Sequence, residues 1–214
     1  MKSITLNGDD VKSIDMAAAE LEKTLQRGDV ILSGPIPKNF STRFLNLIVH
    51  VSIKVLKRIT HSCIYVGDGK VLDIDYKLLK QGTAVELISV HEFVRRKIEN
   101  FGGVTIYVVA PKHYTDKQRE RVVNESINHF FKRRARLTHS YFGSLHLGIR
   151  YIFFKNKKYR ENLHFRNSWT CGEMVAYILK KGGVSIGNRA SYTFVPPMFL
   201  FSKNFRAKSK VSMN

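Results

Sequence analysis

A histidine at the start of one predicted strand and a cysteine at the start of one predicted helix are best suited to covalent chemistry. Cys171 opens an apolar stretch with helical periodicity that ends at Gly182. A thiol at a helix N-terminus faces unpaired N–H groups and the positive end of the helix dipole, which favour a thiolate and can hold an oxyanion. His61 begins a β-branched and aromatic stretch over residues 60–66. We therefore expect Cys171 as a nucleophile and His61 as its general base.

An acidic residue is needed to hold the imidazole in one tautomer, and the next predicted strand offers two. A Gly-Asp-Gly turn at residues 67–69 joins the histidine strand to residues 71–75. Asp73 and Asp75 share one face of that strand because side chains alternate with period two. Either carboxylate can reach His61, and a β-bulge would decide between them.

Cys63 and Trp169 have two interpretations each, and Tyr65 has one. Cys63 lies mid-strand with no helix N-terminus to activate it, so we expect a core residue, and a disulfide with Cys171 stays open because sequence does not give the distance. Trp169 is expected either to line a substrate groove or to anchor the helix that follows it. Tyr65, on the histidine strand, is the second candidate for substrate binding.

The remaining histidines are scattered without the spacing of metal ligands, and no Gly-rich phosphate loop follows a predicted strand. The glycines at 182, 183 and 187 come after a helix, where they indicate a helix end and a loop. We therefore expect no metal and no cofactor.

The composition describes a globular chain with a large positive charge. The 214 residues include 43% hydrophobic residues and two cysteines, which excludes a disordered chain and a disulfide scaffold. No apolar signal core follows Lys2, and the longest apolar stretch, residues 44–53, is too short to span a bilayer. These features predict a cytoplasmic protein, with association with a membrane surface or a virion as alternatives.

The net charge of +19 indicates attraction to a polyanion, unless it serves solubility alone. Two basic clusters have aromatic neighbours, which suits base stacking or a membrane interface. Their residues are Lys132, Arg133, Arg134, Arg136, Lys155, Lys157 and Lys158. They predict an anionic partner, which is membrane, cell wall or nucleic acid.

The predicted elements follow in the order of a helical start, a cluster of antiparallel strands and then helices, which indicates an α+β fold rather than an alternating βαβ fold. We expect helices over 15–26, 41–57, 91–98, 115–132 and 169–181, with part of 141–154, and strands over 29–32, 60–66, 71–75, 85–88 and 104–109. The expected organisation is an N-terminal helical extension (1–26), one domain (27–202) and a basic, flexible tail (203–214).

Four segments together resemble the permuted papain-like cysteine hydrolases of the NlpC type, which include the YiiX-like proteins and the lecithin retinol acyltransferase group. In this branch, as here, the histidine precedes the cysteine. The segments are Gly28-Asp29-Val30-Ile31, Thr60-His61, Thr170-Cys171-Gly172-Glu173 and Pro196-Pro197-Met198-Phe199-Leu200. Gly172 departs from the pattern, since many relatives have Ser after the cysteine.

The resemblance implies a small antiparallel sheet packed against helices, with the catalytic cysteine at a helix N-terminus. It also implies that Asp73, in Leu72-Asp73-Ile74, orients His61. The implied activity is that of a cysteine peptidase or amidase, including one that cleaves cell-wall stem peptides. The alternatives are a lipid acyl hydrolase or acyltransferase with the same residues, or a non-catalytic basic module that binds nucleic acid or anionic membrane.

Overall fold

The computed structural model describes residues 1–6, 11–35, 59–74, 85–101, 103–133, 138–139, 168–186, 199–200 and 202–213. They form an α+β fold, as the sequence predicted at the level of class. The elements are β1 (Lys2–Leu6), α1 (Val11–Glu22), β2 (Val30–Pro35), β3 (His61–Gly67), β4 (Lys70–Ile74), β5 (Val85–Ser89), α3 (Val90–Phe101), β6 (Val104–Pro111), α4 (Asp116–Glu125), the π-helical turn η2 (Ser126–Phe131), β7 (Thr138–His139), β8 (Ser168–Trp169), α6 (Cys171–Lys181) and β9 (Phe205–Met213).

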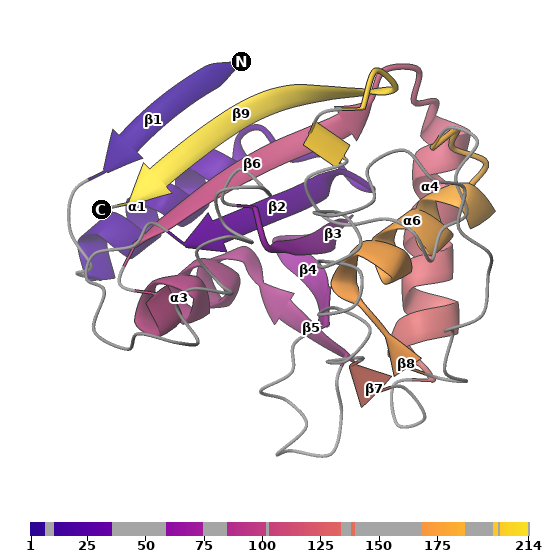
Figure 1. Ribbon diagram of the computed structural model, residues 1–214, viewed down its shortest axis with the longest axis horizontal. Coiled ribbons are helices and arrows are strands. Elements are labelled where there is room, and N and C mark those ends of the chain that lie inside the picture. The colour runs from indigo at the N-terminus through magenta and orange to yellow at the C-terminus, as the bar shows by residue number, and fades with distance from the viewer. Residues whose placement is uncertain are drawn as a thin grey trace, which may run out of the picture.

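The main sheet has seven strands in the order β1-β9-β6-β2-β3-β4-β5 (Figure 1). Every neighbouring pair is antiparallel except β1 and β9, which are parallel. The expected small antiparallel sheet is therefore corrected to a larger, mixed one. The difference arises because both ends of the chain contribute a strand, and a short polar or basic segment carries little apolar alternation to predict a strand.

Helices cover both faces of this sheet and bury two separate cores. On one face, α1 and α3 pack against alternate strand residues, among them Ile31, Cys63 and Val71. On the other face, α4 and α6 pack against the intervening residues, among them Leu32, Ile64 and Leu72. Because strand side chains alternate, β3 and β4 contribute to both cores.

The prediction of a basic, flexible tail over residues 203–214 is wrong for residues 205–213. Residues 205–213 form β9, which lies between β1 and β6 and buries Phe205, Val211 and Met213. The N-terminal residues are not a separate extension either, since β1 pairs with β9 and α1 packs in the same core as α3. The boundaries expected at 27 and 202 therefore do not separate domains among the described residues.

A buried carboxylate ties the C-terminal strand to the rest of the fold. Asp29, at the start of β2, is fully buried and forms ion pairs with Arg119 of α4 at 2.9 Å and with Lys208 of β9 at 2.6 Å. The preceding Gly28 has φ +83°, and a Cβ there would lie 2.2 Å from the Tyr114 hydroxyl oxygen. The Gly-Asp pair of the sequence motif thus serves the assembly of the sheet and α4.

Several local expectations hold at nearly the predicted residues. Thr115 caps α4, which continues as η2, and α6 ends at Gly182, followed by Gly183 with φ +82°. The predicted helices at 41–57 and 141–154, and the segment 196–198, lie outside the described residues. Within the described residues, no helix is long and apolar enough to cross a membrane.

Candidate active site

Helix α6 begins at the candidate nucleophile because Thr170 caps it. The Thr170 side chain accepts a hydrogen bond from the Glu173 N–H at 3.2 Å, and Glu173 Oε2 accepts one from the Thr170 N–H at 2.8 Å. This reciprocal capping box fixes Cys171 as the first helical residue. The Cys171 side chain therefore lies at the positive end of the helix dipole, and the residue is 6% exposed.

His61 and Asp73 are joined across the hairpin of β3 and β4. His61 Nε2 lies 2.5 Å from Asp73 Oδ1, and Asp73 is 1% exposed. A bulge between Tyr65 and Gly67 resets the pairing, which then places Ile64 opposite Leu72. Continued along the strands, this register makes Asp73 a diagonal neighbour of His61 on the same face. The structure thus brings Asp73 to His61, while Asp75 lies outside the described residues.

The other side of the His61 imidazole interacts with the Cys171 thiol. A hydrogen bond links the side chains of His61 and Cys171. Because Asp73 engages Nε2, Nδ1 is the ring nitrogen left for the sulfur. The three expected catalytic residues therefore form one chain of contacts, from α6 through β3 to β4.

Charge within this chain favours the ion pair of thiolate and imidazolium. Burial and the Lys97 charge both oppose protonation of His61, but Asp73 and the Cys171 thiolate outweigh them and raise its pKa to about 9. Burial also raises the pKa of the Cys171 thiol, but His61 and Ser62 reverse that effect and hold the pKa below its ordinary value. Burial opposes ionisation of Asp73 too, yet His61 and Lys97 keep its pKa well below the usual range. The pKa shifts of His61 and Cys171 belong to one coupled pair, whose two groups titrate together.

Ser62 is a site residue that the sequence did not single out. Its N–H and its hydroxyl both favour the Cys171 thiolate. The hydroxyl is fully buried and has no hydrogen-bond partner among the described residues. Ser62 pairs with Leu32 of β2 on one side, and on the other side it lies beyond Ile64, where the pairing of β3 with β4 ends. Its signal in the sequence is a serine on the apolar face of a buried strand.

Lys97 is the second residue that sequence reasoning missed. It is 4% exposed on α3, and its Nζ lies 3.9 Å from Asp73 Oδ2. In the sequence it looks like the end of a solvated Arg-Arg-Lys run. Its spacing in the sequence was the signal for burial. Lys97 is four residues after Phe93 and three after Val94, both of which are buried, so it lies on the apolar face of the helix.

The other candidate residues have structural contacts. Cys63 is buried in the core with α1 and α3, burial raises the pKa of its thiol well above normal, and both cysteines are free. Trp169 makes edge-on ring contacts with Phe130 and Tyr177, each with 5.1 Å between centroids. These contacts support the role of Trp169 as an anchor of α6.

Tyr65 is nine-tenths buried in the same core as Cys63. Its hydroxyl oxygen accepts a hydrogen bond from the Gly69 N–H at 3.1 Å, which closes the hairpin turn. Tyr65 lies four residues along the strand from His61, about 13 Å at the usual strand rise. The structure therefore gives Tyr65 a role in closing the hairpin turn, at the opposite end of β3 from His61.

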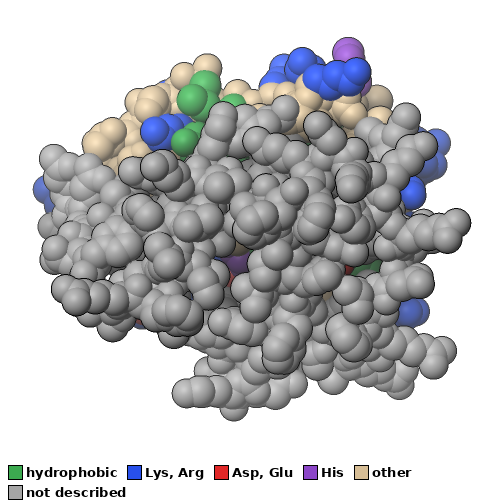
Figure 2. Space-filling model, viewed as in Figure 1, with side chains coloured by type: hydrophobic (Ala, Val, Ile, Leu, Met, Phe, Trp, Pro, Cys, Tyr) green, Lys and Arg blue, Asp and Glu red, His purple; other side chains and the backbone are tan. Residues whose placement is uncertain are grey.

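Of the expected basic partner-binding residues, only Lys132 and Arg133 lie within the described residues, and both are exposed. Lys and Arg side chains of the described part lie around the rim of the face shown in Figure 2. Within the same residues, no group of three or more His, Cys, Asp and Glu could hold a metal ion.

No known protein-family model and no curated protein matches this chain in sequence. The class of protein must therefore be argued from the fold and from the residues that meet at the start of α6.

Proposed function

We propose that the protein is a cysteine hydrolase that cleaves an amide through an acyl-enzyme on Cys171. The observation that carries the proposal is the chain of buried contacts from Cys171 to His61 to Asp73, at the capped N-terminus of a helix. A structural cysteine needs neither an imidazole partner nor a lowered pKa, whereas a nucleophilic one needs both.

The proposed reaction uses Cys171 as the nucleophile and His61 first as an acid and then as a base. The Cys171 thiolate attacks the carbonyl carbon of the substrate, and the N–H groups at the start of α6 stabilise the oxyanion. The His61 imidazolium then gives its proton to the departing amine, which leaves a thioester on Cys171. Water attacks this thioester as His61 accepts its proton, the acid product leaves, and the thiolate and imidazolium are restored.

The permuted papain-like fold is part of the same proposal. It is supported by the order of the catalytic candidates, by the helix that begins at Cys171 and packs on β3, and by the third residue on the strand that follows the histidine strand. In the described residues, this sheet is wider than the expected one, because β9 and β1 are added to its edge.

Peptide amides, including cell-wall stem peptides, are the proposed substrates. A lipid acyl ester would use the same thiolate, so acyl hydrolysis or acyl transfer is the alternative. The surplus of positive charge on the whole chain would favour an anionic surface in either case.

The first test measures alkylation of Cys171 by iodoacetamide from pH 5 to 10.5, with peptide mapping to separate it from Cys63. We expect Cys171 to react well below pH 8.5, and His61→Ala to move its reaction to higher pH. Cys63→Ser is the matched control and should leave the Cys171 profile unchanged. An unreactive Cys171, or one indifferent to His61, would contradict the catalytic pair.

The second test compares a stem-peptide amide with a short-chain p-nitrophenyl ester and a phospholipid. Cys171→Ser should lower turnover of the true substrate class by about a thousandfold or more, and Cys63→Ser should not. If a basic surface were the whole function, Cys171→Ser would retain it, and binding to nucleic acid or anionic vesicles would weaken steeply with salt.

A further inference from the structure

A buried lysine closes a ring of contacts around the candidate imidazole. Asp73 Oδ1 lies 2.5 Å from His61 Nε2, and Asp73 Oδ2 lies 3.9 Å from Lys97 Nζ. The lysine Nζ lies 5.3 Å from the centre of the Phe93 ring, and that ring stacks on His61 with 6.3 Å between centroids. The His61 ring therefore stacks on Phe93 of α3, and its charge is linked through Asp73 to Lys97 of the same helix.

A lysine in this position is costly unless its charge is used. Lys97 belongs to the buried stripe of α3 that also holds Val90, Phe93, Val94 and Ile98. A leucine or methionine would fill the space without the loss of hydration that a buried ammonium group suffers. The neighbouring carboxylate of Asp73 compensates for that loss.

We propose that Lys97 is a positioning residue of the active site, which holds Asp73 in place for His61 and balances the charge of the buried group. This role rests on the proposed function of Cys171. With Lys97, the buried set has two positive groups, Lys97 and imidazolium, and two negative groups, Asp73 and thiolate. Without Lys97, the set has a net charge of −1 in a buried environment.

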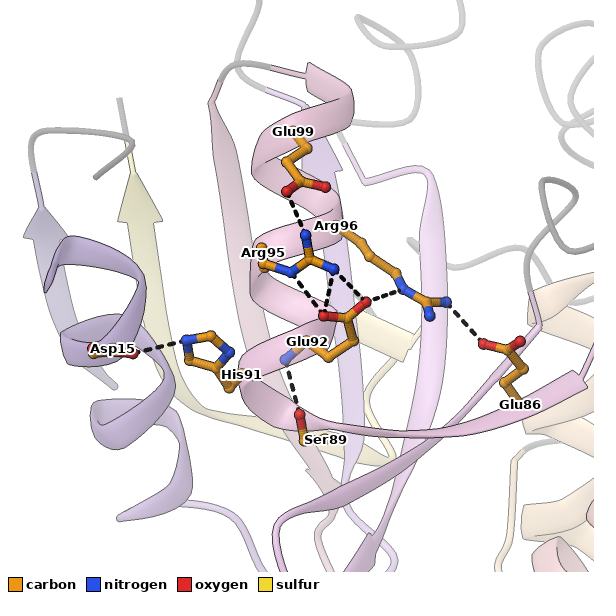
Figure 3. Close-up of polar contacts among 8 residues, drawn as sticks. All are labelled: Asp15, Glu86, Ser89, His91, Glu92, Arg95, Arg96 and Glu99. Atoms are coloured by element: carbon orange, nitrogen blue, oxygen red, sulfur yellow. Dashed lines mark hydrogen bonds and ion pairs between the residues drawn. The ribbon is translucent and has the colours of Figure 1, made fainter. Parts of the chain in front are cut away.

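Glu86, the carboxylate opposite Asp73 in the sheet, is paired with Arg96, while Lys97 lies beside Asp73. Glu86 of β5 is directly opposite Asp73 in the sheet, and like charges in that position repel. Arg96 of α3 lies 2.9 Å from Glu86, and also 2.6 Å from Glu92 (Figure 3). Successive residues of α3 therefore supply one cation to each of the two facing carboxylates.

The effect of removing the Lys97 charge on nearby pKa values depends on the ionisable groups around it. They are Asp73 on β4, His61 and Cys63 on β3, and, beyond its Arg96 partner, Glu86 on β5. The Lys97 charge lowers the pKa of His61, of Asp73 and of Cys63. Removing a positive charge makes every nearby proton harder to remove, so both titration steps of the Cys171–His61 pair should move to higher pH.

The experiment follows Cys171 alkylation from pH 5 to 10.5 in the full chain, with the lower step reporting thiolate formation and the upper step loss of the imidazolium. Lys97→Met should raise both steps by about one pH unit. Lys97→Arg keeps the charge and should restore the wild-type steps. Arg95→Met, on the exposed side of the same helix, is the control and should leave both steps in place.

Each outcome separates this role from the proposed function. A wild-type profile without two steps would overturn the catalytic pair itself. A two-step wild-type profile that Lys97→Met leaves in place would overturn only the role of Lys97, which would then be a packing residue.

A folding defect in Lys97→Met is also informative. If the variant does not fold, the double variant Asp73→Asn with Lys97→Met should regain cooperative unfolding, because it removes the uncompensated buried carboxylate. A double variant no more stable than Lys97→Met alone would contradict a charge-balancing role.

Discussion

We expect Cys171 and His61 to share one proton, and this has a consequence for the stability of the fold. The raised pKa of His61, about 9, and the lowered pKa of the Cys171 thiol both favour an imidazolium beside a thiolate in the folded protein. In the unfolded chain between about pH 6.5 and 8.5, the imidazole is neutral and the thiol keeps its proton. Both states bind one proton, so the pair adds no pH dependence to stability in this range.

We predict that Cys171→Ala makes stability depend on pH where the wild type does not. Asp73 still favours the charged imidazole of His61 in this variant, so we expect the His61 contribution to be present below about pH 6.5 and to be lost as pH rises through the folded pKa. Without the Cys171 charge that folded pKa lies below the wild-type value of about 9. The free energy of unfolding should fall by up to about 1.4 kcal/mol per pH unit in that window.

Urea denaturation at pH 6.5, 7.2 and 8.0 measures this slope. The double variant Cys171→Ala with His61→Gln is the control, and its stability should have lost the slope. Parallel pH profiles for the wild type and Cys171→Ala would show that the two groups do not share a proton. The Asp73 contribution does not interfere, because its lowered pKa means that it is lost only as pH falls below about 4.

At the scale of the elements, helices α3 and α6 both contribute residues to the candidate site. Helix α6 supplies the proposed nucleophile at its first residue, while α3, on the other face of the sheet, supplies Phe93 and Lys97. The strands β3 and β4 lie between them and carry His61 and Asp73. The site therefore depends on the start of α6 being held in one position against the end of β3.

The capping residue of α6 has a matched counterpart that makes this testable. Thr170 and Thr115 each begin a helix with a complete capping box, to Glu173 and Gln118 respectively. Replacement of either threonine by alanine should cost about 1 kcal/mol of stability. Only Thr170→Ala should also slow Cys171 alkylation at pH 6 to 7, since only α6 begins at the nucleophile. Equal effects of both variants on alkylation would contradict a local role of the cap.

The sequence predicted these local features well because their signals are local. The helix predicted over 169–181, which begins at Cys171, the strand at His61 and the hairpin after it each have a short-range signature. Strand spacing alone narrowed the orienting residue to Asp73 or Asp75, and the resemblance favoured Asp73. Spacing did not choose between them because Asp73 is a diagonal neighbour of His61 rather than the residue directly opposite it. Lys97 was missed because its partner is distant in sequence and its charge resembles that of an exposed run.

At the scale of the whole molecule, the two ends of the chain meet in the sheet. β9 lies between β1 and β6, and Lys208 reaches the buried Asp29. The sequence did not predict this, because the basic residues of 203–210 suggested a solvated segment and the alternation of buried residues is interrupted by a bulge. Only the long-range pairing with β6 makes this segment a strand.

We predict that a chain ending at residue 202 does not unfold cooperatively. It would lose β9, expose the edge of β6, leave β1 without its partner and remove the Lys208 ion pair from Asp29. Far-UV circular dichroism during heating would measure the loss. The full chain with Lys203→Gln and Arg206→Gln removes exposed charge from the same segment and should unfold within about 0.5 kcal/mol of the wild type. A truncated chain that melts like the full one would contradict this place for β9.

The parallel pairing of β1 with β9 also determines when the protein can finish folding. During synthesis, residues 2–6 emerge well before residues 205–213, which form their partner strand. Contacts between such distant residues form slowly, because a long loop must close first. Strand β1 must therefore wait, unpaired with β9, until residues 205–213 have left the ribosome, and chaperones that bind exposed strand edges would find it available throughout that interval.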